Sequence, residues 1–116
     1  MNELIIVNLS NGNIVTNKAQ IANSWLKRFL GLLMHKHLLN GEGMLLQPCQ
    51  SIHTLGMRFS IDVVFLDKQL RITKLTRALK PYRFSLSTKG THSVLELPTG
   101  TIEKSGLKTG DRLLVA

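Results

Sequence analysis

The six residues from Ile61 to Leu66 limit the possible folds more than any other part of the chain. They read Ile-Asp-Val-Val-Phe-Leu, a composition rich in the β-branched and aromatic residues that favour strands. Apolar side chains stand at both odd and even positions, so both faces of such a strand are expected to be buried. The segment is therefore predicted to be the central strand of a sheet that is covered on both sides.

Shorter apolar segments on either side predict further strands. Asn11-Gly12 is the strongest hairpin signal in the sequence, and Asp67-Lys68-Gln69 predicts a second turn directly after the central strand. The predicted strands cover residues 4–9, 13–22, 44–47, 70–76, 93–97 and 112–115. A helix beginning at Asn17, with Gln20 completing a capping box, competes with the second of these strands. The strand is the preferred interpretation.

One short helix is expected in the first third of the chain. Ser24 is a good N-cap, and Trp25, Phe29 and Leu32 then recur at helical spacing and form one apolar stripe. A single helical turn is also expected over residues 101–105, ending at Gly106. The fold class is therefore α+β and mainly β: a small twisted sheet that closes into a barrel, with one short helix at about residues 24–32.

The length of 116 residues fits a single domain over residues 1–116. The apolar runs are too short to span a bilayer, and the N-terminus does not read as a signal peptide. A single cysteine, Cys49, excludes an intramolecular disulfide and fits a reducing compartment. We therefore expect a cytoplasmic protein with no membrane span.

Positive charge is concentrated in one stretch of the chain. The formal net charge is +8, and residues 68–89 carry seven lysines and arginines and no acid. Such a strip favours an anionic ligand or a nucleic acid as partner. The candidate residues for polyanion binding, in which cations alternate with an aromatic ring, are Lys74, Arg77, Lys80, Tyr82 and Arg83. The alternative is a solvated basic edge strand, which discourages aggregation through the sheet edge.

Several motifs, read together, resemble one known family. They are RFLGLL at 28–33, GMLL at 43–46, HTLGMRFSID at 53–62, VLELP at 94–98 and GLKTGD at 106–111. In this order and spacing they are similar to the bacterial and archaeal family called domain of unknown function 192. The resemblance runs from about Ala22 to Leu114. It implies a strand-rich single domain, and it implies no established activity, cofactor or substrate.

The densest cluster of functional groups precedes and enters the central strand. It combines an imidazole, a hydroxyl, a thioether and a guanidinium with an acid placed among apolar residues, and a second acid lies in the strand at 93–97. The ligand-binding candidates are His53, Thr54, Met57, Arg58, Asp62 and Glu96. In the structural alternative, Asp62 and Glu96 instead bind backbone amides or basic side chains and fix corners of the barrel.

Motifs for catalysis, metal binding and phosphate binding are weak or missing from the sequence. His35-Lys36-His37 lacks an acid at ligand spacing, and there is no HExxH or CxxC. We assign no catalytic residue, no metal and no cofactor. The preferred hypothesis is a non-catalytic binding module for an anionic ligand or partner. The alternative is a small hydrolase-like enzyme with a site around His53, Asp62 and Glu96.

Overall fold

The strand β5 (Ile61–Leu66) is buried along its whole length, as the sequence predicts. The computed structural model describes residues 3–22, 41–48, 51–53, 59–81, 83–86 and 89–116. On either side β5 pairs antiparallel with β6 (Ile72–Leu79) and with β8 (Ser93–Pro98). It therefore lies inside a sheet and has no free edge.

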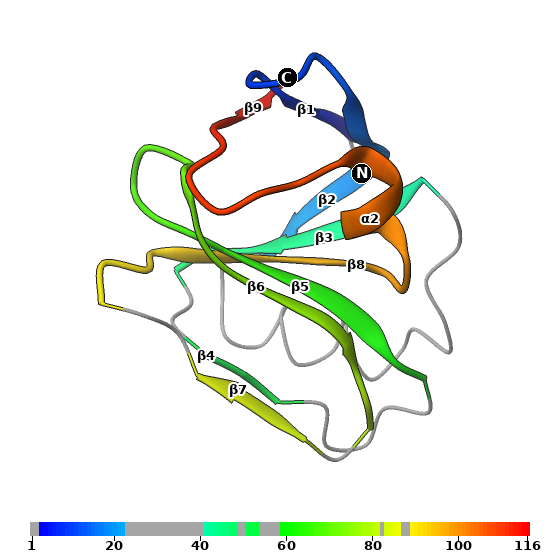
Figure 1. The fold of residues 1–116 in the computed structure, drawn as a ribbon, viewed down its shortest axis with the longest axis vertical. Helices are drawn as coiled ribbons and strands as arrows, with labels where there is room; N and C mark the ends of the chain where they lie inside the picture. Colours follow the sequence, from blue (N-terminus) through cyan, green and yellow to red (C-terminus); the bar gives the residue numbers. More distant parts are fainter. Residues whose placement is uncertain (1–2, 23–40, 49–50, 54–58, 82, 87–88) are drawn as a thin grey trace.

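The main sheet has seven strands in the order β6-β5-β8-β3-β2-β1-β9. The remaining members are β1 (Leu4–Asn8), β2 (Ile14–Ala22), β3 (Glu42–Leu46) and β9 (Leu113–Val115). β2 and β3 run parallel, and the other described strand pairs are antiparallel. The sheet is strongly curled into a half-barrel (Figure 1).

The curl brings the two ends of the sheet together at one point. An isolated bridge joins Arg71, just before β6, to Arg112, just before β9. The amide of Ile72 donates to the carbonyl of Asp111 at 2.8 Å, and the amide of Leu113 donates to the carbonyl of Leu70 at 2.9 Å. These bonds satisfy backbone groups that an open sheet would leave exposed at its edges.

Two smaller elements complete the described structure. β4 (Ser51–His53) and β7 (Phe84–Leu86) form a separate antiparallel pair that lies along the lower side of the main sheet in Figure 1. The helix α2 (Thr101–Ser105) follows β8 and packs beside β2. It ends at Gly106, whose φ of 67° is a conformation that glycine adopts without strain.

The main sheet separates two groups of buried apolar side chains. The first core contains Ile6, Val15, Ala19, Leu45, Val64, Leu66, Ile72, Leu95, Leu97, Ile102, Leu107 and Leu113. The second core contains Met44, Leu46, Ile61, Val63, Phe65, Leu79 and Val94. Successive residues of β5 and β8 enter the two cores in turn, which explains why both strands are apolar at nearly every position.

The predicted fold class is confirmed, since the described chain is mostly strand and curls into a half-barrel. Residues 17–22 belong to β2, so the competing helix from Asn17 is wrong. The helical turn at 101–105 is confirmed as α2. The helix expected at 24–32 lies outside the described residues. Within the described part of the chain, no helix is long and apolar enough to cross a membrane.

Candidate functional site

Asp62 is buried on β5, with both of its carboxylate oxygens bound to backbone amides. Oδ1 accepts a hydrogen bond from the amide of Ala78 at 2.9 Å. Oδ2 accepts from the amides of Gly100 and Ile102, each at 3.0 Å. Three backbone amide donors thus satisfy both oxygens of this buried carboxyl group.

The three amides lie at a β-bulge and at the start of a helix, where the regular backbone hydrogen bonds of strands and helices are interrupted. Ala78 has a φ of 50° and lies where the register between β5 and β6 shifts, as at a β-bulge. Gly100 is the N-cap of α2 and has no side chain to cap it, and Ile102 lies in the first turn. From its place on β5, Asp62 therefore caps the N-terminus of α2 and fixes the bulge in β6. This matches the alternative that the sequence left open, in which the acid binds backbone amides and fixes a corner of the barrel.

Glu96 is also buried, but its surroundings differ from those of Asp62. It lies on β8 opposite Met44 on one side and Val63 on the other, both members of the second core. Within the described structure Oε1 has no hydrogen-bond partner. Burial raises the pKa of Glu96 from its ordinary value of 4.5 to about 8, so the carboxyl group is mainly neutral at pH 7.

The sheet register shows that the two carboxyl groups are not brought together. Residues directly opposite in an antiparallel pair point to the same face. Asp62 is opposite Leu97, a first-core residue, whereas Glu96 is opposite Val63 in the second core. Asp62 and Glu96 therefore point to opposite faces of the main sheet and cannot share one substrate atom.

The remaining ligand-binding candidates are placed only in part. The backbone of His53 ends β4 and pairs with Phe84 of β7. Thr54, Met57 and Arg58 lie outside the described residues. The predicted ligand pocket that joins these residues to Asp62 and Glu96 stays a prediction, except that the structure separates its two acids.

The cationic residues 74–83 run along β6 and on toward β7. Lys74 is opposite Phe65 and thus on the second-core face, where its Nζ lies 5.5 Å from the ring centroid and donates to the carbonyl of Leu86. Arg77, Lys80 and Arg83 are exposed. Tyr82, the proposed stacking ring, lies outside the described residues. We name the set Lys74, Arg77, Lys80 and Arg83 the cationic surface.

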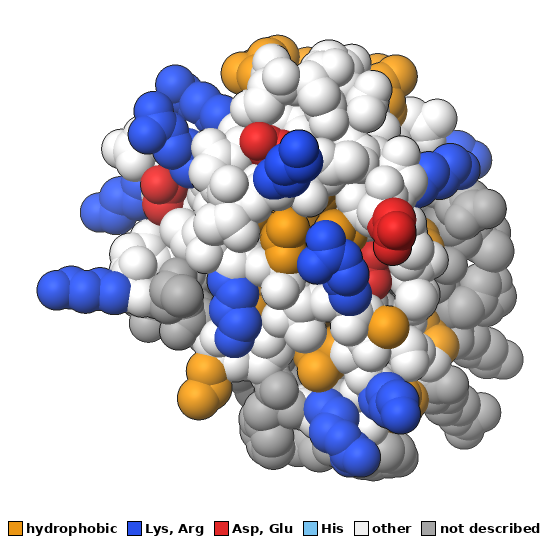
Figure 2. All heavy atoms as spheres, viewed as in Figure 1, with side chains coloured by type: hydrophobic (Ala, Val, Ile, Leu, Met, Phe, Trp, Pro, Cys, Tyr) orange, Lys and Arg blue, Asp and Glu red, His pale blue; other side chains and the backbone are white. Residues whose placement is uncertain are grey.

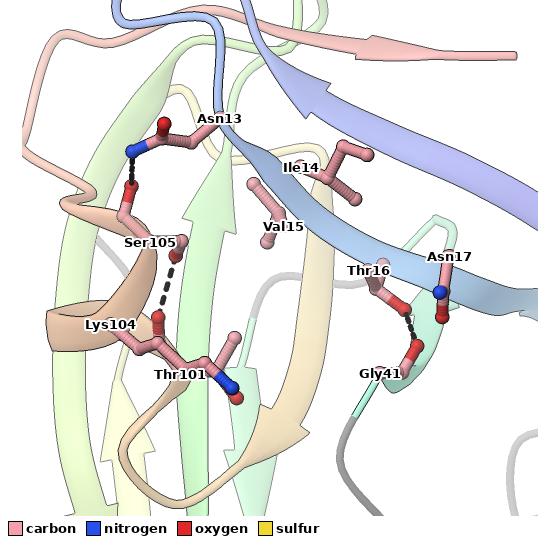
Figure 3. A pocket seen from close by; sticks show the side chains of 9 residues that line it. All are labelled: Asn13, Ile14, Val15, Thr16, Asn17, Gly41, Thr101, Lys104 and Ser105. Atoms are coloured by element: carbon pink, nitrogen blue, oxygen red, sulfur yellow. Dashed lines mark hydrogen bonds between the residues drawn. The ribbon is translucent and has the colours of Figure 1, made fainter.

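A pocket that the sequence analysis missed lies between β2 and α2 (Figure 3). Its volume is about 380 Å³, and its polar lining consists of Asn13, Thr16, Asn17, Thr101, Lys104 and Ser105. These residues lie almost ninety positions apart in sequence and carry no recognisable motif. Among the described residues there is no group of three or more His, Cys, Asp or Glu side chains that could hold a metal ion.

The half-barrel fold defines a class of small domains that is known from solved structures. A protein of unknown function from Novosphingobium aromaticivorans DSM 12444 superimposes with a TM-score of 0.80 and 20% sequence identity. The likeness covers 96% of this chain and 82% of that chain. At this identity it shows the shared fold alone.

Residues 6–115 match the model of the family DUF192, described as Uncharacterized ACR, and the chain belongs to that family. Two archaeal relatives are UPF0127 proteins. The one from Pyrococcus furiosus is 33% identical over 93% of this chain and 95% of its own length. The one from Thermococcus sibiricus is 32% identical over 94% of this chain and 73% of its own length. The resemblance predicted from the sequence is confirmed, and the family is one of unknown function.

Proposed function

We propose that this domain is a non-catalytic binding module that holds an extended polyanion, a single-stranded nucleic acid, on the cationic surface. The observation that supports this proposal is a local imbalance of charge. Between residues 59 and 98 there are seven lysines and arginines against three acids, Asp62, Asp67 and Glu96. Two of these acids are buried, and the third binds the amides of Gln69 and Arg71.

The positive field on this side of the molecule is thus poorly compensated. In Figure 2 the lowest part of the visible face shows Lys and Arg side chains, and the Asp and Glu side chains that can be seen lie higher on the face. A surface of one charge sign raises the local concentration of oppositely charged partners and speeds their association. A phosphate backbone is such a partner, and it needs no sequence readout to bind.

β6 lies at an edge of the main sheet, which matters because its cations point to both faces. Cations three residues apart on a strand point to alternating faces, so they do not all line one groove. β6, however, is the first strand in the order of the main sheet, and among the described residues most of its outer edge has no strand paired to it within that sheet. A partner that follows this edge can reach cations on both faces of the strand. We propose a cytoplasmic location for this binding.

The experiment is a titration of a fluorescent single-stranded oligonucleotide, followed by anisotropy at several salt concentrations. Affinity should fall steeply with salt, because bound cations displace counterions. In the variant Arg77→Gln/Lys80→Gln the salt slope should fall by about 1.4, or about 0.7 for each cation removed, and affinity by about tenfold. The matched control Lys18→Gln/Lys108→Gln removes the same charge from exposed residues elsewhere and should stay close to the unmodified protein. Equal losses in both variants, or an affinity independent of salt, would contradict the proposal.

The alternative, a small hydrolase-like enzyme around His53, Asp62 and Glu96, has less support. A pair of carboxyl groups that act on one bond must flank it. Here the two acids face opposite sides of the sheet, and both oxygens of Asp62 are already bound to amides.

A further inference from the structure

The pocket between β2 and α2 is separate from the cationic surface and from the two buried acids. Its volume of about 380 Å³ lies at the lower end of the range of small-molecule sites. Figure 3 shows β2 forming one wall, α2 the facing wall, and Gly41 closing one end. Ile14, which is 60% exposed, adds an apolar patch to this otherwise mainly polar lining.

The walls of the pocket are fixed by hydrogen bonds within the protein. The side-chain amides of Asn11 and Asn13 donate to the carbonyl of Ser105 at 3.0 and 3.1 Å, which ties the β1–β2 connection to the end of α2. At the other end of the helix, Asp62 binds two amides of the first turn. These bonds hold both ends of α2 in place.

Each hydroxyl group of the lining uses its proton in a hydrogen bond to a backbone carbonyl of the protein. Thr101 donates to the carbonyl of Pro98 at 2.7 Å, and Ser105 donates to the carbonyl of Thr101. Thr16 donates to the carbonyl of Gly41. A hydroxyl has one proton and two lone pairs, so each of these oxygens can offer a ligand only an acceptor. A molecule that enters this pocket must bring hydrogen-bond donors.

The charged and amide groups of the lining further restrict the chemical class of ligand that the pocket can bind. Lys104 is the single charged side chain among the lining residues that the structure describes, and its ammonium group disfavours a cationic ligand. A sulfate offers only acceptors and would face the hydroxyl oxygens without a proton to share, and a phosphate dianion has a single proton for them. Lys104 and the amide of Asn17 can donate, so the lining contains both acceptors and donors. A ligand hydroxyl satisfies both kinds of group.

We propose that this pocket binds a small neutral polyhydroxylated molecule, of the chemical class of a monosaccharide. Its hydroxyl groups donate to Thr101 and Ser105 and accept from Asn17 and Lys104, and a C–H face of its ring lies against Ile14. This site goes beyond the proposed binding of a polyanion. Its binding should not weaken with salt, so failure of one proposal leaves the other standing.

The test is an NMR titration of the full chain with neutral monosaccharides, using glucose, galactose, mannose and ribose as separate probes. Inorganic phosphate and glucose 6-phosphate form the anionic arm. At least one neutral sugar should cause saturable amide shifts in residues 14–17 and 101–105, with an affinity unchanged between low and high salt. Asn17→Ala and Lys104→Ala should each weaken this binding by about tenfold. Lys108→Ala, at an exposed lysine outside the lining, should leave it unchanged.

Three results would overturn the proposal. The first is the absence of saturable shifts in these residues for all four sugars. The second is binding that Asn17→Ala and Lys104→Ala leave unchanged in correctly folded protein, as judged by the remaining amide spectrum. The third is tighter binding of inorganic phosphate than of any neutral sugar at the same residues, which would assign the pocket to anions.

Discussion

Asp62 and Glu96 are both buried acids on neighbouring strands, yet the protein accommodates them in opposite ways. Asp62 faces the first core and accepts three hydrogen bonds from backbone amides. Glu96 faces the second core, where Oε1 has no partner within the described residues, and burial raises its pKa to about 8. The carboxyl oxygens of Asp62 are satisfied by directed backbone donors, whereas Glu96 avoids the cost of a buried charge by keeping its proton.

The difference shows that burial alone does not indicate what an acid does. Asp62 accepts hydrogen bonds from three backbone amides, at the bulge of β6 and the start of α2. Its removal should therefore lower the stability of the fold. Oε1 of Glu96 makes no such bond within the described structure, so replacement of Glu96 by an apolar residue should be tolerated or favourable.

Asp62→Ala should lower the free energy of unfolding by about 5 kcal/mol, because three amides lose their acceptor and two of them lie at the start of α2. Urea denaturation followed by circular dichroism measures the loss. Glu103→Gln changes an exposed acid on the same helix and should shift stability by less than about 0.5 kcal/mol. A loss for Asp62→Ala no larger than that of this control would mean that the capping bonds do not stabilise the fold.

The free energy of unfolding of the unmodified protein should fall between pH 4.5 and pH 8. Across this window the unfolded chain releases the proton of Glu96 while the folded chain retains it, so the unfolded state is favoured as pH rises. The loss amounts to about 4 kcal/mol by pH 8. Urea denaturation at a series of pH values measures it.

Glu96→Met should remove most of that pH dependence and raise stability at pH 8, because Met is apolar and close in size. An unfolding free energy that kept the same pH slope in Glu96→Met would assign the slope to another group. The claim that Glu96 keeps its proton in the folded protein would then be wrong.

Thr76→Val should lower the free energy of unfolding by about 1.5 kcal/mol. The Thr76 hydroxyl is 2.9 Å from the hydroxyl of Ser85, which is buried and loses this partner. The bond links β6 to β7 on the side of the second core. The double variant Thr76→Val/Ser85→Ala removes both groups and should recover part of the loss; a double variant as unstable as the sum of the single ones would show that the two hydroxyls act independently.

Lys74→Met should cost the least, about 0.5–1 kcal/mol of stability. The ammonium group lies over the ring of Phe65, but it is only half-buried and the methionine side chain can cover the same ring. Thermal unfolding measures the difference. A loss larger than that of Thr76→Val would reveal that this lysine holds β7 in place more strongly than the hydroxyl pair does.

Much of the fold follows from local patterns in the sequence. The double-sided apolar character of Ile61–Leu66 predicts a central strand, and the hairpin at Asn11-Gly12 and the helical turn ending at Gly106 follow from backbone preferences. Some boundaries differ. The strand predicted at 70–76 is found at Ile72–Leu79, since Leu70 belongs to the preceding turn with a φ of 64° and Leu79 pairs with Ile61.

The site was harder to predict because it depends on register between distant segments. An acid among apolar residues shows that it is buried, but the faces of Asp62 and Glu96 follow only from the pairing of β5 with β8. The capping partners of Asp62 lie 38 and 40 residues away in sequence. The pocket joins β2 to α2 across a gap of almost ninety positions in the chain and depends on their packing in the folded state.

The most direct test of this account is a carbon NMR titration of the side-chain carboxyl groups in protein labelled at glutamate. The chain has four glutamates, at positions 3, 42, 96 and 103, and the signal that disappears in Glu96→Gln identifies Glu96. We predict that this signal titrates near pH 8. A Glu96 signal that completes its titration below pH 6 would show an ionised carboxylate inside the second core, and the contrast with Asp62 would be wrong.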